Sequence, residues 1–229
     1  MSNETDIIKA TITSITQATK RIKVFRLDYE NRDFTFKPGQ WIDLYAPVEG
    51  KNIGGYTITS SVFEKGQIEL AIRESSTHPV TQYLHNDVTP GSTVMITEGQ
   101  GKFFITEELL KSPLTFIAGG IGLTPLISMF RSMDKTKTPL KIFYSVSSDE
   151  DILFKDELAP YTVFTATKSH TANWEGETKR IDLEMLKKYK TDFFSDFFIC
   201  GPRPMIDGIV SQLVQAGVDK NKIHYEKWW

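Results

Sequence analysis

The sequence predicts two domains: an antiparallel six-stranded β-barrel over residues 1–108, then an α/β domain with a parallel five-stranded sheet over residues 109–229. Two observations predict this order. Up to about residue 106, short runs alternate apolar and polar residues between turn residues, as strands of small barrels do. From about residue 112, strand-like and helix-like runs alternate, and this repeat gives a parallel sheet covered by helices.

In the first domain, period-two alternation marks the strands, and one short helix is expected at 80–85. The expected strands are 10–15, 21–27, 40–45, 56–59, 67–73 and 92–97. In the second domain, apolar runs predict strands at 114–118, 140–144, 161–165 and 196–200. Helices are expected between and after these strands, at 125–133, 152–158, 183–189 and 204–216.

Composition excludes several classes of function. The net charge is −2 with no block of like charges, so nucleic acid is not an expected partner. The single cysteine, Cys200, cannot form an internal disulfide or hold an iron–sulfur cluster alone. The four histidines are scattered, and no metal site is expected. We expect an intracellular, cytoplasmic protein, or a mitochondrial one if a transit peptide has been removed.

One uncharged tract is long enough to imitate a membrane span. Nineteen residues, 112–130, lie between Lys111 and Arg131 without a charge. Two prolines and three glycines interrupt this tract. We therefore expect a buried strand, a glycine turn and the start of a helix, and no membrane span.

That glycine turn is the strongest local motif. Gly119, Gly120 and Gly122 follow an apolar strand and precede a helix. Their backbone N–H groups could approach a pyrophosphate closely, aided by the positive end of the helix dipole. The run departs from the usual dinucleotide pattern, because Pro125 stands at the third glycine position. A tight connection that binds no ligand is the alternative.

A second glycine turn ends another predicted parallel strand. Gly201 follows Cys200, and two prolines lead into the next helix. This places Cys200 at the carboxyl edge of the sheet, where ligands of open α/β sheets bind. The alternative is that Cys200 is only a small buried apolar residue.

In the first half, an aromatic ring is followed by hydroxyl groups. Tyr56 and Ile58 share one face of a predicted strand, while Thr57 and Thr59 share the other. A flat heterocycle could stack on the ring and accept hydrogen bonds from the hydroxyls. One core tyrosine with two surface threonines is the alternative.

Taken together, seven short motifs resemble the ferredoxin–NADP reductase superfamily, and most closely its small members called oxidoreductase NAD-binding domain-containing proteins. The motifs are Pro38–Gln40, Tyr56–Ser60, Pro79–Leu84, Gly99–Phe103, Gly119–Pro125, Cys200–Pro202 and Glu226–Trp228. They occur in the family's order and spacing and span essentially the whole chain.

The resemblance implies an FAD-binding barrel. Tyr56 would pack against the isoalloxazine ring and Thr57 would hydrogen-bond near N5. Val80 and Thr81 would hold the flavin pyrophosphate. The remaining residues implied to contact FAD are Ile58, Thr59, Ala71, Ile72, Arg73 and Pro79.

The resemblance also implies that the second domain binds NAD(P)H, with hydride passing from nicotinamide C4 to flavin N5 in the cleft between the domains. The implied phosphate-binding residues are Gly119, Gly120, Gly122, Leu123 and Thr124. Cys200, Gly201 and Pro202 would flank the nicotinamide. Glu226 would orient that site or relay protons, and Trp228 would cover the flavin and move during turnover. The alternative is that Trp228 and Trp229 only fill the interface between the two domains.

One departure from the family concerns flavin affinity. Most of the superfamily carries an arginine two residues before the tyrosine, and this chain has Gly54. A charge-assisted hydrogen bond contributes about 1.5–3 kcal/mol, so we expect FAD to bind weakly. Arg73 is the nearest substitute by position, although an ordinary surface arginine is the alternative.

The choice of nucleotide stays open at this point. Residues 145–148 read Ser-Val-Ser-Ser where NADP-selective relatives commonly place an arginine, which favours NADH. Lys168, after the third predicted parallel strand, could instead meet a 2′-phosphate.

Three functions follow. The first is an NAD(P)H-dependent flavoprotein oxidoreductase that passes electrons to a separate acceptor: an iron–sulfur or haem protein, a quinone or free flavin. The second is an NAD(P)H:flavin reductase that uses free flavin as a substrate. The third is a non-catalytic module that binds or senses NAD(P).

Overall fold

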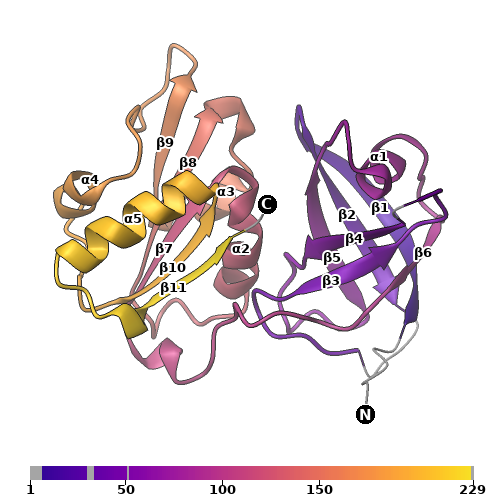
Figure 1. The fold of residues 1–229 in the computed structure, drawn as a ribbon, viewed down its shortest axis with the longest axis horizontal. Helices are drawn as coiled ribbons and strands as arrows, with labels where there is room; N and C mark the ends of the chain where they lie inside the picture. Colours follow the sequence, from indigo (N-terminus) through magenta and orange to yellow (C-terminus); the bar gives the residue numbers. More distant parts are fainter. Residues whose placement is uncertain (1–6, 30–33, 51, 228–229) are drawn as a thin grey trace. The chain divides into compact units, whose positions relative to one another are not determined.

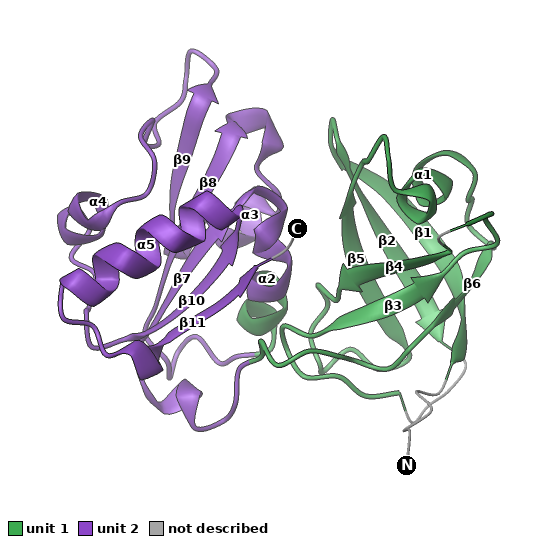
Figure 2. Ribbon diagram, viewed as in Figure 1, with its two compact units in different colours: residues 1–104, 127–132 green, residues 105–126, 133–229 purple. Residues whose placement is uncertain are grey.

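The computed structural model describes residues 7–29, 34–50 and 52–227. The chain divides into two compact units, residues 1–104 with 127–132 and residues 105–126 with 133–229 (Figure 2). Helix α2, Leu123–Arg131, therefore has residues in both units.

Unit 1 is built on a six-stranded antiparallel sheet (Figure 1). Its strands are β1 (Ile8–Thr19), β2 (Ile22–Tyr29), β3 (Trp41–Tyr45), β4 (Ile53–Thr57), β5 (Gln67–Arg73) and β6 (Thr93–Ile96). The order is β4-β3-β6-β1-β2-β5. An isolated bridge between Ile58 and Leu70 joins the chain after β4 to β5 at the far edge, and this contact closes the sheet into a barrel.

Alternation along the strands fills the barrel. Ile42 and Leu44 of β3 are buried, and they pack with inward residues of the other strands in one apolar cluster. Helix α1 (Pro79–Asn86) adds Val80 and Leu84 to the same cluster. The barrel core therefore fixes the position of α1.

Unit 2 contains a five-stranded parallel sheet in the order β11-β10-β7-β8-β9. Its strands are β7 (Leu114–Gly119), β8 (Leu140–Ser148), β9 (Thr162–Ser169), β10 (Asp196–Gly201) and β11 (Ile223–Lys227). The other helices are α3 (Lys155–Leu158), α4 (Leu183–Lys188) and α5 (Arg203–Gln215). Every residue of the central strands β7 and β10 is buried, and α5 packs Ile206, Ile209 and Leu213 over them. The predicted fold class is confirmed.

Three predicted elements need correction. The fifth parallel strand, β11, was missing from the predicted strand segments because its sequence Ile-His-Tyr-Glu-Lys lacks an apolar run, and only Ile223 is buried. The strand expected at 56–59 instead begins at Ile53 and ends at Thr57. The helix expected at 152–158 begins only at Lys155, because Phe154 adopts a left-handed conformation with φ of 53°.

The uncharged tract 112–130 forms β7, a short 3₁₀ turn (Gly120–Gly122) and α2 up to its penultimate residue. Within the described ranges, no helix is long and apolar enough to cross a membrane.

Candidate functional site

The two glycine turns that stood far apart in the sequence meet in unit 2. Strands β7 and β10 are neighbours, and Ala118 lies opposite Cys200. A Cβ atom added to Gly122 would lie 2.5 Å from the carbonyl oxygen of Cys200, and one added to Gly119 would lie 2.7 Å from Cδ of Pro202. Both positions therefore need glycine, because Gly122 packs against the Cys200–Gly201 backbone and Gly119 packs against the ring of Pro202 and the side chain of Met205.

The two turns meet at the topological switch point of the sheet, between β7 and β10, where the order in which strands are added changes sides. From β7 the chain adds β8 and β9 on one side, and then returns to place β10 and β11 on the other. Ligands of open α/β sheets bind outside the carboxyl ends of the strands at such a point.

The turn itself has the properties of a phosphate seat. Gly120 has φ of +54°, and a Cβ added there would meet no atom within 4 Å, so the backbone faces open space. Helix α2 begins directly afterwards, with Leu123 buried and Thr124 donating its hydroxyl to the Ile121 carbonyl at 3.0 Å. Backbone N–H groups before a helix suit a pyrophosphate, so the residues present fit a dinucleotide.

Cys200 and Glu226 are brought side by side. Cys200 is buried and lies outside any disulfide, and its neighbour in register on β11 is Glu226. Gly201 follows with φ of +155°, and a Cβ there would lie 2.9 Å from the Gly119 backbone. Trp228 lies outside the described residues.

In unit 1, Tyr56 folds back over Gly54. A Cβ atom on Gly54 would lie 2.6 Å from the Tyr56 hydroxyl oxygen, so the phenol fills the space that a side chain at position 54 would need. The hydroxyl groups of Tyr56 and Thr81 are 2.9 Å apart. Burial raises the pKa of Tyr56 to about 12, although the bond to Thr81 opposes this shift. The phenol is therefore protonated at neutral pH.

Thr81 belongs to the first turn of α1, which His78 caps. The His78 Nδ1 atom accepts from the Thr81 backbone N–H at 3.4 Å and lies 3.3 Å from its hydroxyl oxygen. Pro79 occupies the first turn, and the side chain of Val80 is directed into the core, so Val80 can offer only backbone atoms to a ligand. Sequence reasoning missed His78, although Pro79 is typical of the first position of a helix and so marks the residue before it as the cap.

The threonines of the β4 region are buried, so the interpretation as two surface threonines is wrong. Thr57 and Thr59 are 6% and 0% exposed, and Ile58 belongs to the barrel core. The Thr59 hydroxyl donates to Glu69 Oε1 at 2.9 Å. That hydroxyl is thus already engaged within the protein.

On β5, Ala71 and Ile72 are buried while Arg73 is exposed at the strand end. The Ile72 carbonyl oxygen lies 3.1 Å from Nε2 of His85, and burial lowers the pKa of this histidine. Arg73 pairs in register with Ile22 and adds a charge at the barrel edge.

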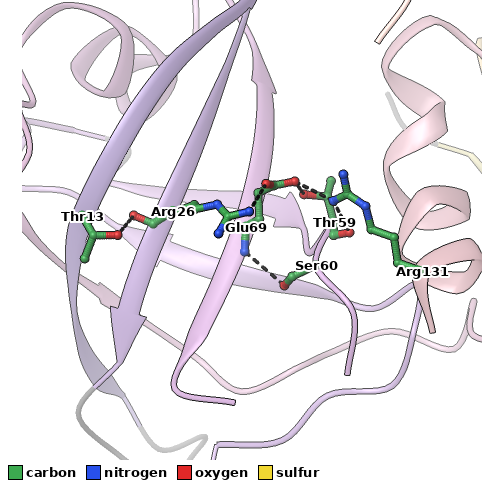
Figure 3. A network of polar contacts seen from close by, with 6 residues as sticks. All are labelled: Thr13, Arg26, Thr59, Ser60, Glu69 and Arg131. Carbon is green, nitrogen blue, oxygen red and sulfur yellow. Dashed lines mark hydrogen bonds and ion pairs between the residues drawn. The ribbon is translucent and has the colours of Figure 1, made fainter. Parts of the chain in front are cut away.

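A polar cluster around Glu69 was not predicted (Figure 3). The carboxylate accepts from Arg131 Nη1 at 2.7 Å and from Thr59, and Arg26 approaches to 3.6 Å. Arg131 also donates to the Thr59 carbonyl at 3.0 Å. A signal existed, because Glu69 interrupts an apolar run, but its partners are distant in sequence.

No group of His, Cys, Asp and Glu that could hold a metal occurs within the described part of the chain.

Comparison with known proteins agrees with this architecture. An oxidoreductase FAD-binding domain model matches residues 9–105, and an oxidoreductase NAD-binding domain model matches residues 116–211. Among solved structures, the ferredoxin reductase in carbazole 1,9a-dioxygenase has a TM-score of 0.87 at 21% identity, covering 100% of this chain and 71% of that one. A ferredoxin NADP⁺ reductase from Neisseria gonorrhoeae with bound FAD and NADP has a TM-score of 0.82 at 21% identity, covering 99% and 100%.

Fold and domain content thus define an oxidoreductase with an FAD-binding and an NAD-binding domain and a ferredoxin reductase-like fold. A curated relative, oxidoreductase NAD-binding domain-containing protein 1 of Pongo abelii, is 33% identical over 91% of this chain and 75% of its own length. The chain belongs to this family of oxidoreductase NAD-binding domain-containing proteins, and its fold is that of the two ferredoxin reductase structures.

Proposed function

We propose that the protein oxidises NAD(P)H, passes the hydride to FAD and then delivers electrons to a separate acceptor. The observation that carries this proposal is the meeting of the two glycine turns at the switch point of unit 2, in a chain whose first half matches an FAD-binding domain. FAD supplies, when bound, acceptance of a hydride at N5 and its release as one or two electrons. We propose residues 1–108 and 109–229 as the limits of the two domains.

In the proposed nucleotide site, backbone N–H groups would bind the phosphates. Gly119, Gly120 and Gly122 allow the close approach, and Leu123 and Thr124 start the helix whose N–H groups face the anion. Cys200, Gly201 and Pro202 would line the nicotinamide end. Glu226, beside Cys200 in register, would orient the ring or hold a proton, and Trp228 would cover the flavin.

In the proposed flavin site, Tyr56 and Thr57 would contact the ring and the first turn of α1 would bind the phosphates. Tyr56, Thr81 and His78 already form one hydrogen-bonded chain at that turn. Pro79 and Val80 complete the turn. The buried residues Ile58, Thr59, Ala71 and Ile72, with Arg73 at the exposed end of β5, would shape the rest of the site through backbone and packing contacts.

A flavin reductase with exchangeable flavin is the second candidate, and one observation favours it. The phenol of Tyr56 fills the space at Gly54, so the side-chain groups that meet at this turn are the uncharged hydroxyls of Tyr56 and Thr81, where most of the superfamily has the arginine that position 54 lacks. Neutral donors bind a diphosphate more weakly than a guanidinium does. The similarity to the ferredoxin reductase in carbazole 1,9a-dioxygenase favours instead a protein acceptor, such as an oxygenase.

We propose NADH as the preferred nucleotide. Asp149 follows the end of β8, and Thr171 donates to its carboxylate through both backbone N–H and hydroxyl, which holds its pKa below the ordinary value. A fixed negative charge at this edge would oppose a 2′-phosphate, whereas Lys168 on β9 would favour one. Initial rates with NADH and NADPH measure the preference.

The function is tested by adding NADH to the FAD-loaded protein without oxygen. Rapid bleaching of the flavin absorbance is expected. Binding of both compounds without bleaching would identify a non-catalytic NAD(P)-binding module instead. Release of reduced flavin through a dialysis membrane would favour the flavin reductase, and retention would favour a protein acceptor.

A further inference from the structure

The ion pair between Glu69 and Arg131 lies outside the residues assigned above, yet it is built into unit 1. The side chains of Glu69 and Arg131 are 7% and 17% exposed, and their closest atoms are 2.7 Å apart. Burying such a pair costs desolvation, so it is weak support for stability by itself. The hydrogen bonds that both partners make to one segment of backbone indicate a positioning role for the pair.

Both partners hold the same short segment of chain. Glu69 accepts from the Thr59 hydroxyl, its backbone N–H donates to the Ser60 hydroxyl at 3.1 Å, and Arg131 donates to the Thr59 carbonyl (Figure 3). Ser128 and Ser132 add bonds to the Ser60 carbonyl and the Val62 N–H. Residues 59–62 are therefore fixed on two sides, by β5 and by the end of α2.

This segment continues directly from the candidate flavin residues. Thr59 stands two residues after Thr57, and both are buried. Helix α2 starts at the glycine turn proposed to bind the nucleotide phosphates, and its second half belongs to unit 1 (Figure 2). The Glu69–Arg131 pair thus joins the end of that helix to the strand extension that follows Thr57.

We propose that Glu69 and Arg131 are positioning residues for hydride transfer: the pair fixes α2 to the Thr59–Ser60 backbone and so holds Thr57 at its working position. The inference rests on the proposed function. Neither residue needs to touch the flavin or the nicotinamide. Because a misplacement of about 1 Å can lower a rate about 100-fold, loss of the pair should slow transfer far more than it weakens binding.

The test uses three variants of the full chain. Arg131→Met leaves a buried carboxylate without its main cation and can fail to fold, so the informative variant is Glu69→Leu with Arg131→Met, which removes both charges together. Arg26→Met is the matched control, because Arg26 lies 3.6 Å from the same carboxylate but is half exposed. Stopped-flow flavin reduction gives the transfer rate, and titrations give the Kd values for FAD and NADH.

We expect the double variant to fold and to transfer hydride on the order of 100-fold more slowly at saturating NADH, with both Kd values changed less than about threefold. The control should transfer at the wild-type rate. A wild-type rate in the double variant would overturn the proposal. An equal loss of FAD affinity would overturn it as well, because the pair would then serve binding.

Amide hydrogen exchange separates this proposal from the proposed function. Residues 59–62 should exchange faster in the double variant and at the wild-type rate in Arg26→Met, whether or not the protein reduces flavin. If the wild type fails to reduce flavin, the proposed function is wrong, and faster exchange at 59–62 would still support the anchoring that the pair provides. Unchanged exchange would show that the pair does not hold the segment.

Discussion

The two candidate sites of this protein are built in different ways. In unit 2, the proposed phosphate seat consists of backbone, formed where Gly122 lets the turn after β7 touch the Cys200 backbone at the end of β10. In unit 1, the proposed flavin seat consists of side chains from separate elements, with Tyr56 from β4 hydrogen-bonded to Thr81 of α1, which in turn contacts His78. The backbone seat therefore tolerates no added side chain at its glycines. The side-chain seat depends on hydrogen bonds, and removing a single hydroxyl group breaks one of them.

The largest effect is expected at Gly122. A side chain there meets the Cys200 carbonyl at 2.5 Å, and because that atom is backbone, the turn must move. We expect Gly122→Val to weaken NADH binding about 100-fold or more while FAD affinity stays unchanged. Isothermal titration with each compound measures this. Gly208→Ala is the control, since a Cβ there meets nothing within 4 Å, and a comparable loss in the control would contradict the backbone account.

A pH experiment examines the side-chain seat. The pKa of Tyr56 is raised to about 12 by burial, so its contribution to stability is complete below pH 10 and is lost as the pH rises from 10 to 12. Two pKa units correspond to about 2–3 kcal/mol. Urea unfolding should show that the wild type loses this much more stability than Tyr56→Phe over that range. Parallel losses would show that the phenol is not buried.

Removing the Tyr56 or the Thr81 hydroxyl should weaken the binding of FAD and leave the affinity for NADH unchanged. A neutral hydrogen bond contributes about 0.5–1.5 kcal/mol, so Tyr56→Phe should weaken FAD binding about two- to tenfold. Thr81→Val should weaken FAD binding at least as much, because it also removes the contact with His78, and the double variant should lose little more than Thr81→Val alone. Quenching of flavin fluorescence measures the Kd. An effect on NADH affinity equal to that on FAD would remove the distinction between the two seats.

The smallest effect is expected from the chain end. Truncation after Glu226 removes Trp228, and we expect a change of a few-fold, about 1 kcal/mol, in the ratio of NADH to NADPH rates. Steady-state kinetics with both nucleotides measure that ratio. An unchanged ratio would show that the aromatic end does not cover the nicotinamide site.

The contrast between a site made of backbone and a site made of side chains also explains which features could be predicted from the sequence. The barrel, the parallel sheet and the glycine turns produce local patterns, namely period-two alternation and glycines after an apolar strand. Strand β11 was not predicted because it lies at the edge of the parallel sheet, where only one of its residues is buried and its sequence has no apolar run. The Glu69 cluster and the contact of Tyr56 with Gly54 escaped because they depend on side-chain directions and on partners as far apart as Glu69 and Arg131.

The central claim is that this chain moves a hydride from NADH to FAD. The most direct measurement is anaerobic single-turnover reduction of the FAD-loaded protein by NADH carrying deuterium at the transferred position. We expect bleaching of the flavin whose rate saturates with NADH and is lower with the deuterated nucleotide. Full occupancy by FAD and NADH with no bleaching, or bleaching at the rate of free flavin in solution, would contradict it.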